Sequence, residues 1–309
     1  MPADSEVTIV KSNPQDFEIK KVEPGIASVN RFFLVVLLLM LVFGSIAQGF
    51  HFKGGLLFSQ WVIVLLPAIW YWKRYGLIMP RLVPLKSKYL PTLLVLSVSA
   101  FFLNMTFALL LIEFLMYFGF EPIALLPIPE TLGQLGVYLF IIAFTAGVCE
   151  EVLFRGTIMP SLERYGQVPA LVFSSLLFAL MHLSFTNLVG TFFVGLLFGV
   201  VVMKSGSLLA GMVLHMLNNA FAMVFLYGVG DVEVGLESLA PAFYLLPVAA
   251  LAGLIYGLLK LQRQSGAKPL LQNRKSWFPR GWPTVAFFAA LFIFLCMAML
   301  EMLLGFGFF

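Results

Sequence analysis

Five ionisable side chains lie within apolar stretches of this sequence, and their types are those that acid–base chemistry requires. Glu150 and Glu151 are adjacent, and Arg155 follows Glu151 by four residues. His182 and His215 each lie in a separate apolar stretch further along the chain. Charged groups cost several kcal/mol at membrane depth, so they usually face one another or a water-filled cavity. Carboxylates and imidazoles gathered in this way indicate a polar site that can activate water.

The spacing of the acidic pair predicts different surroundings for its two members. Residues 138–155 have the pattern of one helix, on which Glu151 and Arg155 share a face and can pair. Glu150 is rotated by about 100° from Glu151, so it can point elsewhere. We therefore expect Glu151 and Arg155 to form a structural pair and Glu150 to be the working carboxylate. The alternative is that all three form a salt-bridge cluster at the helix end.

Two further polar motifs follow at one-turn spacing. Phe178 precedes His182 by four residues, and His215 precedes Asn219 by four, so each pair shares a helix face. A single histidine in an apolar helix is more often a satisfied core residue, and polar residues on membrane helices often only hydrogen-bond to a neighbouring helix. These structural interpretations weaken when the groups are taken together, because two of the three histidines share an apolar region with the acidic pair.

The elements that must position these groups are transmembrane helices. Hydrophobic residues make up 61% of the 309 residues and charged residues 11%, whereas soluble domains have roughly 45–50% and about 25%. Apolar runs long enough to cross roughly 30 Å of hydrocarbon recur along the chain. We expect an all-α, polytopic transmembrane bundle of about nine spans, with eight as the alternative because one run is short and another is long. The predicted spans are residues 31–50, 56–73, 90–118, 137–156, 168–186, 188–203, 207–227, 241–260 and 283–304.

Basic residues test the number and direction of these spans. With the N-terminus inside the cell, 18 of the 19 Lys and Arg residues fall in cytoplasmic segments, and only Lys53 lies outside them. This asymmetry is what the positive-inside rule expects, and it favours nine spans. The net charge of +4 therefore indicates orientation and anionic lipid, and not a nucleic-acid partner. The segments counted as cytoplasmic are 1–31, 73–90, 155–167, 203–206 and 260–282.

These patterns divide the chain into four parts. Residues 1–30 are polar and contain three prolines, which is typical of a disordered cytoplasmic tail. Residues 31–136 are an N-terminal group of transmembrane helices, 137–227 a catalytic transmembrane core, and 228–309 a C-terminal group of transmembrane helices. The expected location is the cell (plasma) membrane, as an integral multi-pass protein.

Three motifs in order, Glu-Glu-x3-Arg, Phe-x3-His and His-x3-Asn, resemble those of the CPBP family of membrane proteins. That family comprises type II CAAX prenyl endopeptidases and bacterial relatives, some of them linked to bacteriocin processing or self-immunity. The resemblance extends over residues 138–227. It implies an intramembrane endopeptidase whose substrate is a peptide or a membrane protein, either with a prenylated CAAX-type end or with a leader peptide.

The resemblance also implies a role for each motif residue. Glu150 would be the general base and would activate a water molecule with help from His182. His215 and Asn219 would stabilise the oxyanion of the tetrahedral intermediate. The remaining motif residues would support the site by holding the helix or by packing: Glu151, Arg155 and Phe178.

Metal dependence and protein class stay open on the sequence. Glu150, His182 and His215 are adequate zinc ligands by type, so a metalloprotease is the main mechanistic alternative. The helix motif His-Glu-x-x-His is absent, and we favour a site without metal or other cofactor. The same polar cluster would also suit a transporter or channel, although we detect no internal repeat of the kind that transporters often carry. A catalytically silent membrane scaffold is the third possibility.

Overall fold

The computed structural model describes residues 24–77, 84–122, 128–229, 245–267 and 276–308, and within these ranges it contains helices and no strand. Eight helices of this part of the chain are long and apolar enough to cross a membrane. They confirm the all-α, polytopic fold. The eight are Ile26–Phe50, Phe52–Tyr75, Ser87–Met116, Leu132–Tyr165, Leu188–Ser205, Leu208–Val229, Leu245–Ser265 and Val285–Gly305.

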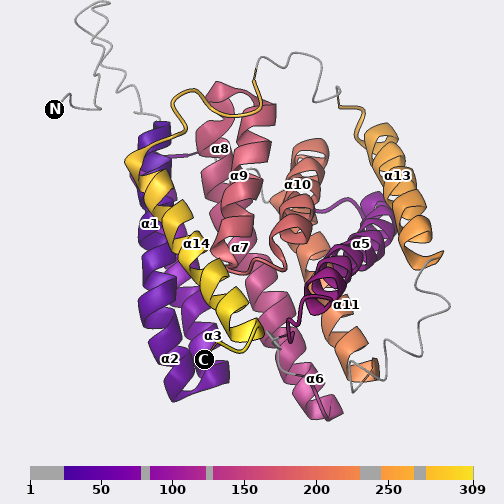
Figure 1. Ribbon diagram of the computed structural model, residues 1–309. Helices are drawn as coiled ribbons and strands as arrows, with labels where there is room; N and C mark the ends of the chain where they lie inside the picture. Colours follow the sequence, from indigo (N-terminus) through magenta and orange to yellow (C-terminus); the bar gives the residue numbers. More distant parts are fainter. Residues whose placement is uncertain (1–23, 78–83, 123–127, 230–244, 268–275, 309) are drawn as a thin grey trace, which may run out of the picture.

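Several spans contain short π-helical stretches between α-helical segments, and Figure 1 labels the α-helices. The first two spans are α1 (Ile26–Leu39), η1 (Met40–Gly44) and α2 (Ser45–Phe50), then α3 (Phe52–Phe58), η2 (Ser59–Leu65) and α4 (Leu66–Tyr75). The fourth span joins α6 (Leu132–Tyr138), η4 (Leu139–Thr145), α7 (Ala146–Leu153), η5 (Phe154–Ile158), α8 (Met159–Leu162) and η6 (Glu163–Tyr165). The other helices are η3 (Ser87–Tyr89), α5 (Leu90–Met116), α9 (Gln167–Met181), α10 (Leu188–Ser205), α11 (Leu208–Val229), α13 (Leu245–Ser265) and α14 (Val285–Gly305).

Helix α9 is where the structure departs from nine spans. The apolar run 168–186 predicts one span, but the helix ends at Met181, and its 15 residues rise about 22 Å, less than the roughly 30 Å of a hydrocarbon core. Leu183 then adopts a left-handed φ of 52°, which turns the chain out of the helix. The helices α9 and α10 pack against each other (Figure 1). By length and composition alone, eight helices of the described residues qualify as spans, which is the number given by the alternative, and α9 is a shorter apolar helix.

The distribution of basic residues assigns several helix ends to the cytoplasmic side. These ends lie together at one end of the bundle. The backbone N–H of Ile26 donates to Tyr165 Oη at 3.1 Å, and Asn30 Nδ2 donates to Thr284 Oγ1 at 2.8 Å. The starts of α1 and α14 and the end of η6 therefore lie together, at the top of Figure 1. This arrangement fits the predicted alternation of direction when α9 is counted as one of the segments, while the cytoplasmic N-terminus itself stays a prediction.

The predicted boundary of the N-terminal tail also shifts. Residues 1–23 lie outside the described residues, and the chain is helical from Ile26 onward. Hydropathy alone predicts that the first span starts at residue 31, but the first helix begins earlier. Ser28 and Asn30 interrupt the apolar run over residues 26–30, so hydropathy does not show that the helix extends there. The side chain of Asn30 hydrogen-bonds to Thr284 at the start of α14.

The helix that carries the acidic pair lies at the centre of the bundle. Helix α7 packs against η2, α4 and α11, and Figure 1 shows it surrounded by the other helices. Large apolar side chains on the peripheral helices point outward, as hydrocarbon surroundings allow; examples are Phe114, Val248 and Phe292. The bundle is thus apolar on its outer surface and polar at α7.

Candidate active site

The Glu151–Arg155 pair predicted from the spacing is present and fully buried. Arg155 Nη1 lies 2.7 Å from Glu151 Oε1, and neither side chain is exposed. Arg155 Nη2 donates to the backbone carbonyl of Gly195 on α10 at 2.7 Å. The rings of Phe178 and Phe198 lie 4.6 and 5.4 Å from the guanidinium carbon. Removing one partner of such a pair would leave the other charge buried and uncompensated.

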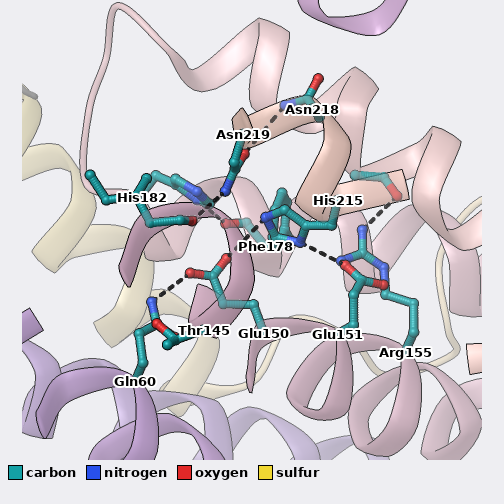
Figure 2. Close-up of polar contacts among 12 residues, drawn as sticks. Gln60, Thr145, Glu150, Glu151, Arg155, Phe178, His182, His215, Asn218 and Asn219 are labelled. Carbon is teal, nitrogen blue, oxygen red and sulfur yellow. Dashed lines mark hydrogen bonds and ion pairs between the residues drawn. The ribbon is translucent and has the colours of Figure 1, made fainter. Parts of the chain in front are cut away.

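Glu151 also contacts the third motif, which same-helix spacing does not predict. Its Oε1 lies 3.1 Å from His215 Nδ1 on α11. His215 is buried, and its other ring nitrogen, Nε2, lies 3.9 Å from Glu150 Oε2. Figure 2 shows the imidazole between the two carboxylates. Glu151 therefore orients His215 in addition to pairing with the arginine.

Glu150 has a different environment from that of its neighbour. Its Oε1 accepts a hydrogen bond from Gln60 Nε2 at 2.8 Å, and Gln60 lies on η2 in the second span. Its Oε2 is buried and accepts no hydrogen bond from the residues that the structure describes. Glu150 is 7% exposed. One carboxylate oxygen is thus held by a neutral amide, and the other is free to receive a proton.

His182 is placed by the end of α9 and by its packing on Phe178. It is the first residue after the helix, and its Nδ1 lies 2.8 Å from the backbone oxygen of Phe178. The imidazole and the Phe178 ring meet edge to face, with centroids 4.8 Å apart. Because a carbonyl oxygen can only accept, Nδ1 carries a proton, and in the corresponding neutral tautomer Nε2 is the acceptor nitrogen.

Asn219 lies near the same site but already has backbone and side-chain partners. Its Nδ2 donates to the backbone oxygen of Ile142 on η4 at 3.0 Å, and its Oδ1 accepts from Asn218 Nδ2 at 3.4 Å. An amide nitrogen has two N–H groups, so one stays available for a further acceptor. Figure 2 shows Asn219 together with His182 and His215 on the same side of the Glu150 carboxylate. The fold therefore gathers all four residues to which the resemblance assigns catalytic roles.

Two contact residues were not predicted from the sequence. Gln60 is the first. The second is Glu301 on α14, whose carboxylate accepts from the backbone N–H of Phe185 at 2.5 Å and from Thr186 Oγ1 at 2.6 Å. Ser184 Oγ lies 3.3 Å from the same carboxylate. Glu301 thus holds the loop 183–187, which begins directly after His182. Both are polar or charged residues inside a predicted span, and this feature of the sequence could have pointed to them.

The donor set for a metal is incomplete in the described part of the chain. No group of three or more His, Cys, Asp or Glu side chains within it is arranged to hold a metal ion. Among the predicted zinc ligands, Glu150 Oε1 faces an N–H donor from Gln60 and His182 Nδ1 faces a carbonyl. Glu150 Oε2 and the two Nε2 atoms would have to converge on the ion. The zinc alternative stays a prediction that experiment must test.

Comparison with known proteins supports the resemblance found in the motifs. Residues 133–221 match the sequence model of the family described as type II CAAX prenyl endopeptidase Rce1-like. The matched segment contains all three motifs, so the predicted resemblance to the CPBP family is confirmed for this part of the chain. The chain has no match among curated proteins or among solved structures. Gln60 and Glu301 both lie outside the matched residues.

Proposed function

We propose that the protein is an intramembrane endopeptidase that hydrolyses a peptide bond with water activated by Glu150 and His182. The observation that carries this proposal is the environment of Glu150. Its Oε2 is a buried acceptor without a partner in the described chain, 3.9 Å from His215 Nε2. The family matched by residues 133–221 consists of endopeptidases by its description. Glu151 Oε2 is buried without a partner as well, so the two carboxylates differ at the other oxygen: Glu151 Oε1 pairs with Arg155, whereas Glu150 Oε1 accepts from the neutral amide of Gln60.

The proposed reaction uses these groups in two steps. Glu150 Oε2 removes a proton from a water molecule, with the acceptor Nε2 of His182 orienting it, and the water oxygen attacks the scissile carbonyl carbon. The protonated carboxyl then gives its proton to the amide nitrogen, and the C–N bond breaks. The products are a carboxylic acid and an amine, and Glu150 returns to its starting state.

The oxyanion of the tetrahedral intermediate needs donors that are already in position. Asn219 Nδ2 has one N–H beyond that used by Ile142. His215 would supply the second donor through an N–H on Nε2 when both ring nitrogens carry a proton, with Nδ1 donating to Glu151. Both donors are fixed by partners on other helices, so little reorganisation accompanies the development of negative charge.

The substrate we propose is a peptide or membrane-protein segment that reaches the site from the membrane or the cytosol. A prenylated CAAX-type C-terminus is the first substrate to test, because the description of the matched family names this class. A leader peptide of a membrane or secreted protein is the second. The proposed location is the plasma membrane, with the basic segments in the cytoplasm.

The test is a cleavage assay with the purified, detergent-solubilised protein, farnesylated C-terminal CAAX-type peptides and unmodified peptides. Glu150→Gln keeps the shape of the side chain and the contact with Gln60, but removes the base. We expect it to lower kcat by about 10²- to 10⁴-fold with an unchanged Tm. The matched control is Glu113→Gln, at an exposed position on α5. Equal activity of wild type and Glu150→Gln would refute the assignment, and silence of a folded wild type would favour a transporter or a scaffold.

Chelation separates the metal-free mechanism from the zinc alternative. We propose the metal-free site, so activity should survive exhaustive chelation, and the purified protein should contain less than stoichiometric metal by elemental analysis. Loss of activity that returns on addition of zinc would establish the metalloprotease mechanism. In that case Glu150, His182 and His215 would hold the ion, which would polarise the scissile carbonyl or the water.

A further inference from the structure

Gln60 is a polar side chain in the second span, where it follows Ser59 and precedes a run of apolar residues. It lies in the π-helical stretch η2, whose sequence is Ser-Gln-Trp-Val-Ile-Val-Leu. A buried amide without hydrogen bonds costs free energy in an apolar environment, so its partners indicate what it does. Neither the three motifs nor the family match includes this residue, since the match begins at residue 133.

The contact of Gln60 is made only through its donor. Its Nε2 donates to Glu150 Oε1 at 2.8 Å, between residues 90 positions apart in the chain. Its own carbonyl oxygen is buried and has no hydrogen-bond partner within the described ranges. Asn30, whose amide links α1 to the start of α14, likewise has an unpartnered oxygen, so the free oxygen alone does not mark a special role. What distinguishes Gln60 is its partner, the carboxylate of Glu150.

The partners of the two adjacent glutamates differ in charge. Glu151 is neutralised by Arg155 at 2.7 Å, which suits a permanent structural pair. Glu150 Oε1 meets a neutral amide, which holds that oxygen without adding a charge of its own, and the other oxygen lies 3.9 Å from His215 Nε2. A base must both accept and release a proton during one reaction, and a neutral partner permits both states.

We propose that Gln60 is a positioning residue for Glu150. Its N–H holds Oε1 and thereby directs Oε2 toward His215, so that Oε2 is the atom that takes the proton from water. This inference rests on the proposed endopeptidase function, because it assigns Gln60 a part in that reaction. It adds a residue from the second span to a site whose other members lie in the matched segment.

The first test compares Gln60→Met with Gln48→Met. Methionine has nearly the same shape as glutamine and lacks its donor. Gln48 makes a comparable contact one helix earlier, where its Nε2 donates to Ser59 Oγ at 3.3 Å, and it serves as the matched control. We expect Gln60→Met to lower kcat by about 10- to 100-fold with KM changed less than about twofold, because the base loses its orientation while substrate contacts persist. Gln48→Met should retain wild-type kcat.

The second variant, Gln60→Glu, provides a readout that a structural role would not affect. At high pH the introduced carboxylate cannot donate to Glu150 and places a like charge beside it. At low pH the introduced group is protonated and again donates a hydrogen bond. Its kcat relative to wild type should therefore rise as the pH falls. A ratio that is constant with pH would overturn the proposal, and this result is decisive even if Gln60→Met fails to fold.

The remaining outcomes are also decisive. A Gln60→Met kcat equal to that of Gln48→Met in a folded protein would overturn the positioning role. A raised KM with unchanged kcat would assign Gln60 to substrate binding and would equally contradict it. If wild type shows no cleavage that depends on Glu150, the proposed function itself fails, and that failure is seen before any Gln60 variant is measured.

Discussion

The segment that matches the family and the helices that flank it contribute differently to the site. Residues 133–221 carry every ionisable group in the three motifs. The flanking helices contribute one contact from each side: Gln60 holds Glu150 Oε1, and Glu301 holds the loop that follows His182. The ionisable motif residues are thus concentrated in one segment, whereas their placement depends also on helices distant in the chain.

The largest effect is expected within the matched segment, at its buried ion pair. Arg155→Met leaves the Glu151 carboxylate buried without its partner, and we expect it to destabilise the protein by about 3–5 kcal/mol. The measurement is the Tm and the yield of folded protein in detergent. Arg164→Met, at the end of the same span, is the control. A stable but inactive Arg155→Met would mean that the pair serves chemistry directly, and the division between Glu150 and Glu151 would be wrong.

The next effect is expected at Asn219, which tests whether a motif residue outside the acidic pair acts in the reaction. Removing one oxyanion donor typically costs about 10²- to 10³-fold in kcat, so Asn219→Ala should show a loss of this size. Asn218→Ala changes the neighbouring amide and should lose less than about tenfold, because its contact with Asn219 is long, 3.4 Å. Similar losses in both variants would indicate that helix packing, and not oxyanion stabilisation, explains the effect.

The smallest effect is expected in the flanking helices, at Glu301. Glu301→Gln keeps the size of the side chain but replaces one acceptor oxygen by a donor, which faces the N–H of Phe185 or the hydroxyl of Thr186. We expect kcat/KM to fall by about tenfold, since small displacements of a catalytic group are costly. Glu113→Gln is the matched control. If Glu301→Gln and Glu113→Gln have the same activity, the loop after His182 does not need its contact with α14. The helix that follows the matched segment would then not help to position the site.

The sequence predicts the helical fold and the polar residues of the site because both depend on residue type and local spacing. Hydropathy identifies helices, and the four-residue spacing correctly pairs Glu151 with Arg155. The same rule does not predict that Glu151 also meets His215, which is 64 positions away and on another helix. Contacts of this kind arise from helix packing, which a single sequence does not reveal.

The end of α9 was mispredicted for a related reason. Residues 182–189 contain no glycine or proline to mark a break, and hydropathy alone does not register that Leu183 takes a left-handed conformation. The carboxylate that holds this turn lies on α14, more than one hundred residues later. Gln60 was missed likewise, because a single polar residue in an apolar span has no local partner that suggests its role.

The contact between Glu301 and the loop after His182 has a consequence for the order in which the site is assembled during synthesis. Helices enter the membrane in chain order, so a nascent chain that has already inserted all three motifs still lacks α14. Until that helix arrives, the loop 183–187 has neither its carboxylate partner nor the packing of α14 against α9. The loop after His182 therefore takes up these contacts only once α14 has been synthesised, later than all three motifs.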